Sequence, residues 1–335
     1  MRAIRFIIWT IAWLILSLCV LWAVGALFFD FPVTKLRAFA PNALVVVVFL
    51  AIFFVRGQTR KLLAVFCAFL VVLAWWQFTL RPSNDRPWQL DVAETAWAEI
   101  NGDEVTIHNV RNCDYRSETD YTPRWETRVV RLSQIDGVDL AITYWGSPLI
   151  AHPIASFQFA DALPICFSIE TRKEIGESYS AIGGLYRQYE LIYICADERD
   201  AIRLRTNYRH GEDVYLYRTL LSPDKARGRF LEYLNSLNSL HARPRWYNAL
   251  TTNCTTAIRE QHNASDRLPW DWRILVNGKA DEMMFERKVI ATGGFGFADL
   301  KRRCHINERA RAADQSSDFS RLIREGLPNP PSASK

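Results

Sequence analysis

The chain has 335 residues, enough for two average domains, and a net charge of +5. The basic residues are scattered and no RNA- or DNA-binding signature occurs, which argues against a nucleic-acid partner. The hydrophobic share of 49% is an ordinary mean but is unevenly distributed. Residues 1–80 contain three long apolar runs, whereas residues 81–335 have the composition of a soluble domain.

The three apolar runs predict a membrane anchor. Residues 6–29 form 24 uncharged positions, which is long enough to cross a bilayer. A cleaved signal peptide is the alternative, but the run is too long and no small-x-small cleavage site precedes Asp30. Residues 38–55 and 62–80 supply 18 and 19 further uncharged positions, the second ending in a Trp- and Phe-rich belt. We expect three crossings.

The short loops indicate the orientation of these crossings. The tight basic turn at 56–61 is of the kind retained in the cytoplasm, together with Arg2 and Arg5. Residues 81–335 would then face the periplasm of a Gram-negative bacterium, with the chain a multi-pass protein of the inner membrane. If the second run does not cross, that domain is cytoplasmic instead.

The cysteines agree loosely with an exported domain. Residues 81–335 hold five of the seven, an odd number, so at least one has no partner within the chain. We expect at least one disulfide among the four that lie apart from the motif discussed below: Cys113, Cys166, Cys195 and Cys304. No CxxC or Cys/His zinc spacing occurs, and we expect neither a metal nor a cofactor.

The remainder of the chain changes from strand to helix patterns. Short β-branched or aromatic segments predict strands at 104–110, 126–132, 138–145, 155–159, 165–170, 189–196 and 213–220. Ser222-Pro223 then starts a helix with an apolar stripe, and helical patterns recur after Cys254 and at 281–290. This order predicts an α+β fold. We divide the chain into an anchor (1–80), a domain (81–295) and a basic polar tail, partly disordered (296–335).

The segment "RWYNALTTNCTTAIREQHN" places Cys254 where an irregular stretch turns into a helix. If Thr252 or Asn253 caps that helix, the thiol lies in its first turn, where unpaired amides favour a thiolate. A buried inert cysteine, or one half of a disulfide, is the alternative.

A nucleophilic cysteine needs a base, normally histidine. His262 is eight residues further along the same helix, roughly 12 Å away at 1.5 Å per residue, which is too far. His152, in "SPLIAHPIASFQF", stands at the entry to a strand, where it could face the helix of the nucleophile. The other candidates are ordinary residues by context: His108, His210, His241 and His305.

Three motifs together carry a family resemblance: "YELIYICADERDAIRLRTNYRHGEDVYLYR", "RPRWYNALTTNCTTAIR" and "LPWDWRILVNGKADEMMFE". Residues 140–290 resemble the bacterial family with an Lnb-type N-terminal periplasmic domain, long of unknown function. That family is similar to permuted NlpC/P60 and papain-like thiol enzymes, with an antiparallel sheet packed on helices, and includes a lipoprotein N-acyltransferase with a cysteine nucleophile. The resemblance implies that Cys254 is the nucleophile and His152 its base.

The resemblance does not identify a third catalytic group. Each acidic or amide side chain in the matched stretches could orient the base, supply an oxyanion donor or only stabilise the fold: Glu170, Glu190, Glu198, Asn248 and Asn253. Many relatives carry an aromatic residue where this chain has Lys279, so its substrate could differ from theirs.

Three functions remain open from the sequence. The first is a periplasmic acyltransferase that moves acyl groups of phospholipids or lipoproteins through a thioester on Cys254. The second is a thiol amidase or peptidase acting on peptidoglycan or envelope peptides, with water in place of the amine. The third is a non-catalytic envelope scaffold, in which Cys254 would be paired or buried. The oligomeric state is not indicated.

Overall fold

The computed structural model describes residues 2–252, 254–261, 271–274 and 277–330. The chain divides into two compact units. Unit 1 comprises Met1–Ser83, Ser178–Glu190 and Trp246–Leu250, and unit 2 comprises Asn84–Glu177, Leu191–Arg245 and Thr251–Lys335. Each unit is described by itself below.

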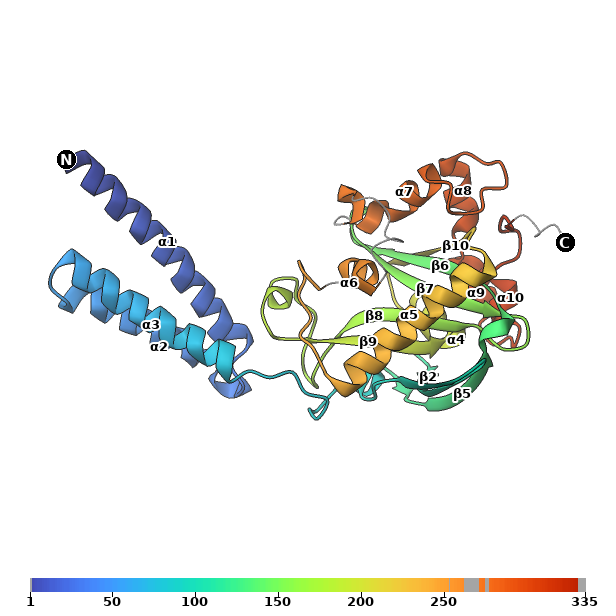
Figure 1. The fold of residues 1–335 in the computed structure, drawn as a ribbon, viewed down its shortest axis with the longest axis horizontal. Helices are drawn as coiled ribbons and strands as arrows, with labels where there is room; N and C mark the ends of the chain where they lie inside the picture. Colours follow the sequence, from blue (N-terminus) through green and yellow to red (C-terminus); the bar gives the residue numbers. More distant parts are fainter. Residues whose placement is uncertain (1, 253, 262–270, 275–276, 331–335) are drawn as a thin grey trace. The chain divides into compact units, whose positions relative to one another are not determined.

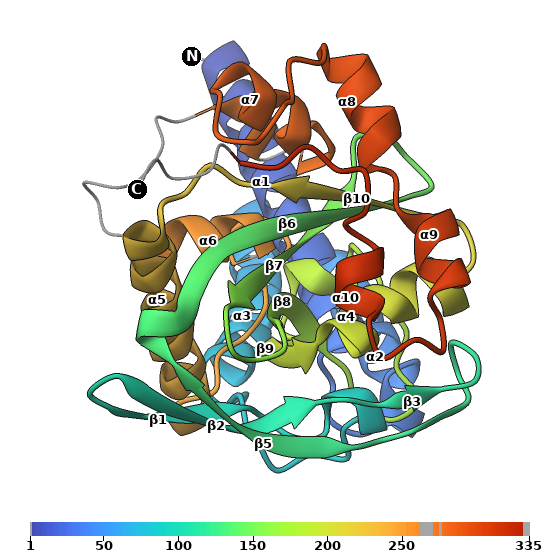
Figure 2. The same cartoon turned by 90° about the vertical axis from the view of Figure 1, so that its right-hand side faces the viewer.

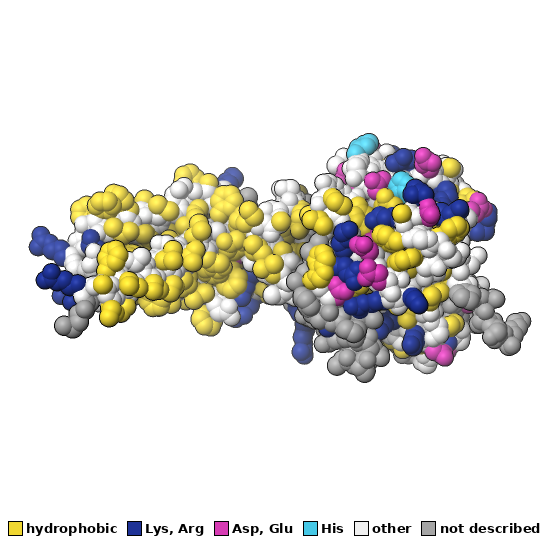
Figure 3. Space-filling view, turned by 90° about the horizontal axis from the view of Figure 1, so that it is seen from above, with side chains coloured by type: hydrophobic (Ala, Val, Ile, Leu, Met, Phe, Trp, Pro, Cys, Tyr) yellow, Lys and Arg dark blue, Asp and Glu magenta, His cyan; other side chains and the backbone are white. Residues whose placement is uncertain are grey.

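Unit 1 contains three helices, α1 (Arg2–Phe29), α2 (Phe39–Phe54) and α3 (Gln58–Phe78). Successive helices run in opposite directions, so the N-terminus and the α2–α3 turn lie at the same end of the bundle (Figure 1). Helices α1 and α3 are long and apolar enough to cross a membrane, whereas α2 has only 16 residues. Apolar side chains cover the outside of the helices (Figure 3), as expected where lipid replaces water.

Unit 2 is built on one mixed sheet, to which the described residues contribute eight strands in the order β1-β2-β9-β8-β7-β6-β10, with β5 beside β2. The strands β2 and β9 are parallel, and β1–β2, β2–β5, β6–β7, β7–β8 and β6–β10 are antiparallel. The bounds are β1 (Trp97–Asn101), β2 (Glu104–Arg111), β5 (Trp125–Arg131), β6 (Ile135–Trp145), β7 (Ala151–Phe159), β8 (Ile165–Arg172), β9 (Glu190–Asp197) and β10 (Glu212–Arg218). A separate ribbon pairs β3 (Asp114–Tyr115) with β4 (Tyr121–Thr122).

Helices cover both faces of this sheet, which confirms the α+β prediction, but the sheet is mixed and not antiparallel throughout as the resemblance implied. Figure 2 shows α5 (Pro223–Ala242) on one side and α4 (Glu198–Arg203), α9 (Asn307–Ala312) and α10 (Phe319–Leu322) on the other. Helix α5 starts as predicted, because the Ser222 side chain accepts a hydrogen bond from the Lys225 amide and Pro223 occupies the first position. The remaining helices are α6 (Cys254–Gln261), α7 (Ala280–Glu286) and α8 (Phe297–Cys304).

Most of the segment expected to be a polar tail is packed into unit 2. Residues 297–322 form α8, α9 and α10, and their apolar side chains join the sheet's core: Leu300, Ile306, Ala310, Phe319 and Ile323. The basic residues of this segment occupy the outer faces of short helices whose inner faces are apolar.

The predicted disulfide among the four outer cysteines is wrong, because all seven cysteines are free thiols. The four are each buried, at separate places in the fold, and pack as small apolar side chains: Cys113, Cys166, Cys195 and Cys304. Burial raises the pKa of the Cys113 thiol to about 11 and that of Cys195 and Cys304 to about 12, so these thiols stay protonated.

Candidate functional site

Helix α6 begins at Cys254, which confirms that this cysteine lies in the first turn of a helix. The helix packs against strands β7 and β8 of the sheet. Cys254 is half-buried and unbridged, whereas the other four cysteines of unit 2 are buried. Cys254 is thus the thiol of unit 2 that a reagent or substrate can reach. Asn253, the expected cap or oxyanion donor, lies outside the described residues.

His152 lies on β7, and its imidazole is held from the neighbouring strand β8. The side chain is 8% exposed, and its Nε2 is 2.7 Å from Ser168 Oγ. Ser168 in turn donates its hydroxyl hydrogen to Glu170 Oε1 at 2.7 Å. Because Ser168 has only one hydrogen to donate, Nε2 of His152 is the donor to Ser168. The imidazole therefore carries its proton on Nε2 and presents Nδ1 as a lone pair.

A buried ion pair completes this arrangement. Arg205, from the segment Leu204–Tyr208, donates to Glu170 Oε1 at 3.0 Å and lies 3.3 Å from Glu212. Burial would raise the pKa of Glu170, but the charge of Arg205, with smaller contributions from Arg111 and Arg209, outweighs it and holds that pKa well below its usual range. Glu170 is therefore an ionised acceptor, and this fixes the hydroxyl orientation of Ser168.

The same surroundings keep His152 neutral. Burial is the largest influence and the Arg205 charge adds to it, while Glu170 opposes both, so the pKa of His152 falls to about 3. At neutral pH the site therefore contains a neutral imidazole beside an ionised carboxylate. At neutral pH the imidazole therefore does not rest as an imidazolium paired with a thiolate.

Asn277 contacts Cys254 and the residue that precedes His152, and the sequence did not single it out. Its Nδ2 lies 3.7 Å from Cys254 Sγ, and its Oδ1 accepts a hydrogen bond from the Ala151 amide at 2.9 Å, next to His152. The signal was present in the sequence as the Asn-Gly pair of "LVNGKADEMMFE".

Gly278 explains why the Asn277–Gly278 pair can lie against the backbone of Pro148 and Leu149. A Cβ at this position would collide with the backbone of Pro148 and Leu149. The glycine amide donates to the Leu149 carbonyl at 3.1 Å, and its own carbonyl accepts from the Tyr144 hydroxyl at 3.1 Å. The close approach of these two backbones sets the position of the preceding Asn277 side chain.

The other candidates for a third group have different partners. Glu198 is fully buried and binds Ser156 and Arg324, which makes it part of a structural charge cluster on β7, α4 and the turn after α10. Asn248 holds a turn in unit 1, accepting from the Leu250 amide and donating to the Leu185 carbonyl. Of the acidic candidates, Glu170 is the one connected to His152.

The remaining histidines are engaged elsewhere or exposed. His108 stacks on Trp97 with ring centroids 4.0 Å apart, and His241 is hydrogen-bonded to Thr95. His305 pairs with Asp213 at 3.0 Å, His210 is exposed in a turn, and His262 lies outside the described residues. Lys279 is 3.2 Å from Glu282 on the surface.

These features define an α+β domain in which a reachable cysteine starts a helix that packs against the strands carrying a buried, neutral histidine and its hydrogen-bond partners. The family model described as Lnb N-terminal periplasmic domain matches residues 121–278, which include both residues. The chain therefore contains a domain of this family, as the motifs predicted. The domain and the two candidate membrane helices fit a membrane-anchored periplasmic protein. No curated protein and no solved structure matches the chain.

Proposed function

We propose that this protein is a membrane-anchored periplasmic acyltransferase that carries acyl groups from phospholipids or lipoproteins on Cys254 as a thioester. The observation that supports it most strongly is the hydrogen-bonded series His152–Ser168–Glu170, which lies on the strands against which the helix starting at Cys254 packs. This series orients the imidazole with Nε2 toward Ser168, and we propose that Nδ1 receives the thiol proton. A scaffold protein would need neither this orientation nor a reachable, unbridged cysteine.

In the first step, the Cys254 sulfur attacks the carbonyl carbon of the donor ester. Nδ1 of His152 accepts the thiol proton as the carbon–sulfur bond forms, and the imidazolium returns that proton to the departing alcohol oxygen when the ester bond breaks. The ionised Glu170, acting through Ser168, stabilises the transient positive charge on the ring. The products are an alcohol and a Cys254 thioester.

In the second step, an amine attacks the thioester carbonyl and transfers its proton to His152, which returns the proton to the sulfur as the carbon–sulfur bond breaks. The products are an amide and the free thiol. The Asn277 amide nitrogen, 3.7 Å from the sulfur, is placed to donate to the oxygen that becomes negative in each tetrahedral intermediate. Attack by water instead of the amine would give a hydrolase.

The anchor is proposed to cross the inner membrane three times. Helices α1 and α3 run in the same direction within unit 1 (Figure 1), so if both cross, α2 must return across the bilayer between them. Its 16 residues span about 24 Å at 1.5 Å per residue, short of a ~30 Å hydrocarbon core, a mismatch that membranes accommodate by local thinning. Basic residues cluster at the end of the helices that carries the N-terminus and the α2–α3 turn (Figure 3), which favours a cytoplasmic position for that end.

The order His152 before Cys254 also fits a permuted NlpC/P60-like or papain-like arrangement, which we include in the proposal. It agrees with a nucleophile helix packed against the strands that carry the base and its partners.

The full-length protein in detergent, treated with an iodoacetamide probe at neutral pH, tests the reactivity of Cys254. We expect probe labelling of the peptide that contains Cys254, loss of that labelling in Cys254→Ser, and retention in Cys67→Ser, which removes an exposed thiol of α3. An unlabelled Cys254 would contradict both enzyme functions.

Incubation with a diacylated lipopeptide and phospholipid, read by mass spectrometry, then separates transfer from hydrolysis. A lipopeptide mass increase of one acyl chain supports transfer. Loss of an acyl or amide group without that increase supports the hydrolase.

A further inference from the structure

Besides its three long helices, unit 1 contains two further segments, residues 178–190 and 246–250. Together they form a small subdomain, which we call the platform. They are joined through their backbones, because the Tyr247 amide donates to the Tyr189 carbonyl at 2.9 Å and the Ala249 amide to the Gly184 carbonyl at 2.7 Å. Both segments belong to the same compact unit as the three helices.

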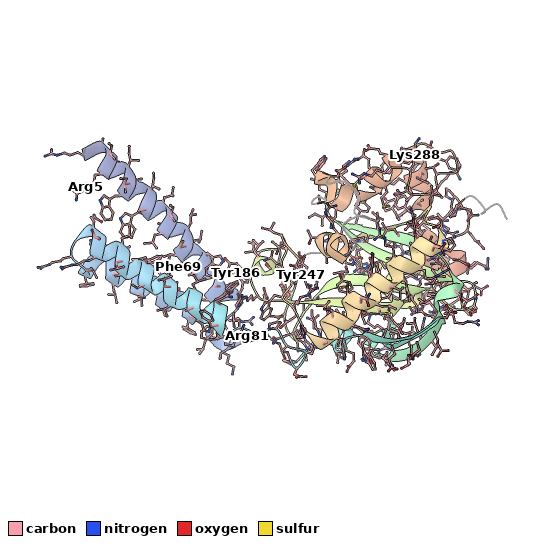
Figure 4. The ribbon with its side chains drawn as sticks, in the orientation of Figure 1. Arg5, Phe69, Arg81, Tyr186, Tyr247 and Lys288 are labelled. Carbon is pink, nitrogen blue, oxygen red and sulfur yellow. The ribbon has the colours of Figure 1, made fainter. Side chains whose placement is uncertain are left out.

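The platform is packed on the ends of α1 and α3 opposite Arg5 (Figure 4). The ring of Tyr186 stacks on Phe29 with centroids 5.2 Å apart and lies 6.3 Å from Trp22. Gly25 on α1 makes room for this ring, since a Cβ there would collide with the tyrosine hydroxyl. The glycine in the α1 sequence therefore provides the space that this contact needs.

A polar contact fixes the same position from α3. The guanidinium of Arg187 lies 3.6 Å from the ring centroid of Trp76, and the Arg187 amide donates to Asp30 at 3.1 Å. The Trp76 indole donates to the same carboxylate at 2.6 Å. Tryptophan with paired charges at a helix end is typical of the membrane–water interface, so the platform starts at the level where the bilayer ends.

The platform exposes large apolar side chains at this level. Tyr179, Ile182, Leu185 and Leu250 are 52%, 61%, 41% and 69% exposed. Fully burying one such aliphatic side chain is worth about 1.5–3 kcal/mol. If α1 and α3 cross the membrane as proposed above, a bilayer surface would cover these side chains.

A cavity of about 620 Å³ opens between the platform and the helices, lined by Val24, Gly25, Phe28, Ala38, Ile182 and Tyr186 among other residues. Its volume falls within the about 300–1,000 Å³ of ligand pockets, and its lining is mainly apolar. Lys35 is exposed in the α1–α2 connection at the same end of the helices and would complement a phosphate group. A long acyl chain attached to an anionic headgroup matches both features.

We propose that the platform inserts into the outer leaflet and that this cavity holds an acyl chain of a membrane phospholipid. The role of that phospholipid as the acyl donor rests on the function proposed above, whereas membrane insertion and lipid binding do not. The sequence supports a connection between the lipid site and the acyl transfer, because the platform residue Leu250 is only four positions before Cys254.

Insertion is tested with full-length protein in vesicles of phosphatidylcholine and phosphatidylglycerol. A nitroxide at Ile182→Cys is compared with one at His210→Cys, an exposed position of unit 2. At position 182 we expect higher accessibility to oxygen than to a water-soluble nickel chelate, and at 210 the reverse. Equal nickel accessibility at the two positions would overturn the insertion.

Lipid binding is tested by photo-crosslinking to phosphatidylglycerol with a diazirine in its acyl chain. Ala38→Trp fills the cavity and should lower the crosslinking yield at least fivefold, whereas Ala43→Trp, on α2 but not among the cavity residues, should leave it unchanged. Equal yields in both variants would overturn the cavity assignment.

The same crosslinking in Cys254→Ser separates the two proposals. If crosslinking is undiminished in Cys254→Ser and the wild-type protein transfers no acyl group, the lipid site stands and the proposed acyltransferase activity is wrong. Transfer that persists in Ala38→Trp would retain the enzyme and reject this cavity as the donor site.

Discussion

Replacing His152 with Gln should make the free energy of unfolding less sensitive to acidic pH. In the folded protein this imidazole stays neutral down to a pKa of about 3, because burial and Arg205 disfavour its charged form. In the unfolded chain it protonates near pH 6.5. Between these values the unfolded state binds more protons, so the folded state loses stability as the pH falls.

The magnitude follows from the size of this shift. One pH unit within the window corresponds to about 1.4 kcal/mol, so lowering the pH from 6.5 to 5.0 should cost the wild type about 2 kcal/mol through His152. Glu170 works differently, because its pKa is held below its ordinary value of 4.5 and its stabilising contribution is lost only below that pH. Between pH 6.5 and 5.0 the difference between the wild type and His152→Gln therefore reports the histidine and not Glu170.

The assay is chemical denaturation of the full-length protein in detergent at both pH values. His152→Gln should lose about 2 kcal/mol less unfolding free energy than the wild type, whereas His210→Gln, altered in an exposed turn, should behave as the wild type. An equal loss in wild type and His152→Gln would refute the buried, neutral imidazole.

Three further predictions concern the surroundings of the site. Asn277→Ala should slow thioester formation about 100-fold, the typical effect of removing one oxyanion donor, while iodoacetamide labelling of Cys254 persists; an unchanged rate would exclude this role. Gly278→Ala should lower the free energy of unfolding by about 1–3 kcal/mol through collision with the Leu149 backbone, measured by denaturant titration, and an unaltered value would contradict the close approach. Mass mapping without reductant should find four free thiols, and a bridge between any two would contradict their burial as separate apolar side chains: Cys113, Cys166, Cys195 and Cys304.

Local patterns were sufficient for much of the fold. Alternating polarity predicted β2, β5, β6 and β8 within a few residues, and the Ser-Pro start with an apolar stripe predicted α5. Strand β1 was missed, although Asn101-Gly102 between two strands is a common hairpin signal. The helices after residue 296 were missed because their short apolar faces alternate with many charges, so the composition resembles that of a tail.

The candidate site was predicted less completely, because it depends on contacts between distant segments. The position of Cys254 at a helix start follows from local sequence, and the family motifs supplied His152. Ser168 and Asn277 are small polar residues whose roles arise only when β8 and the connection after α6 approach β7. The disulfide prediction failed for a related reason, since an odd count of cysteines does not reveal their positions in the core.

The most direct test of the account is the intact mass of the protein after brief incubation with a diacylated lipopeptide or phospholipid and acid quenching. We predict a mass increase of one acyl chain on the peptide containing Cys254, released by hydroxylamine and absent in Cys254→Ser, with strongly reduced accumulation in His152→Gln. Persistence of the acyl adduct in Cys254→Ser, or its attachment to another residue, would contradict Cys254 as the acyl carrier.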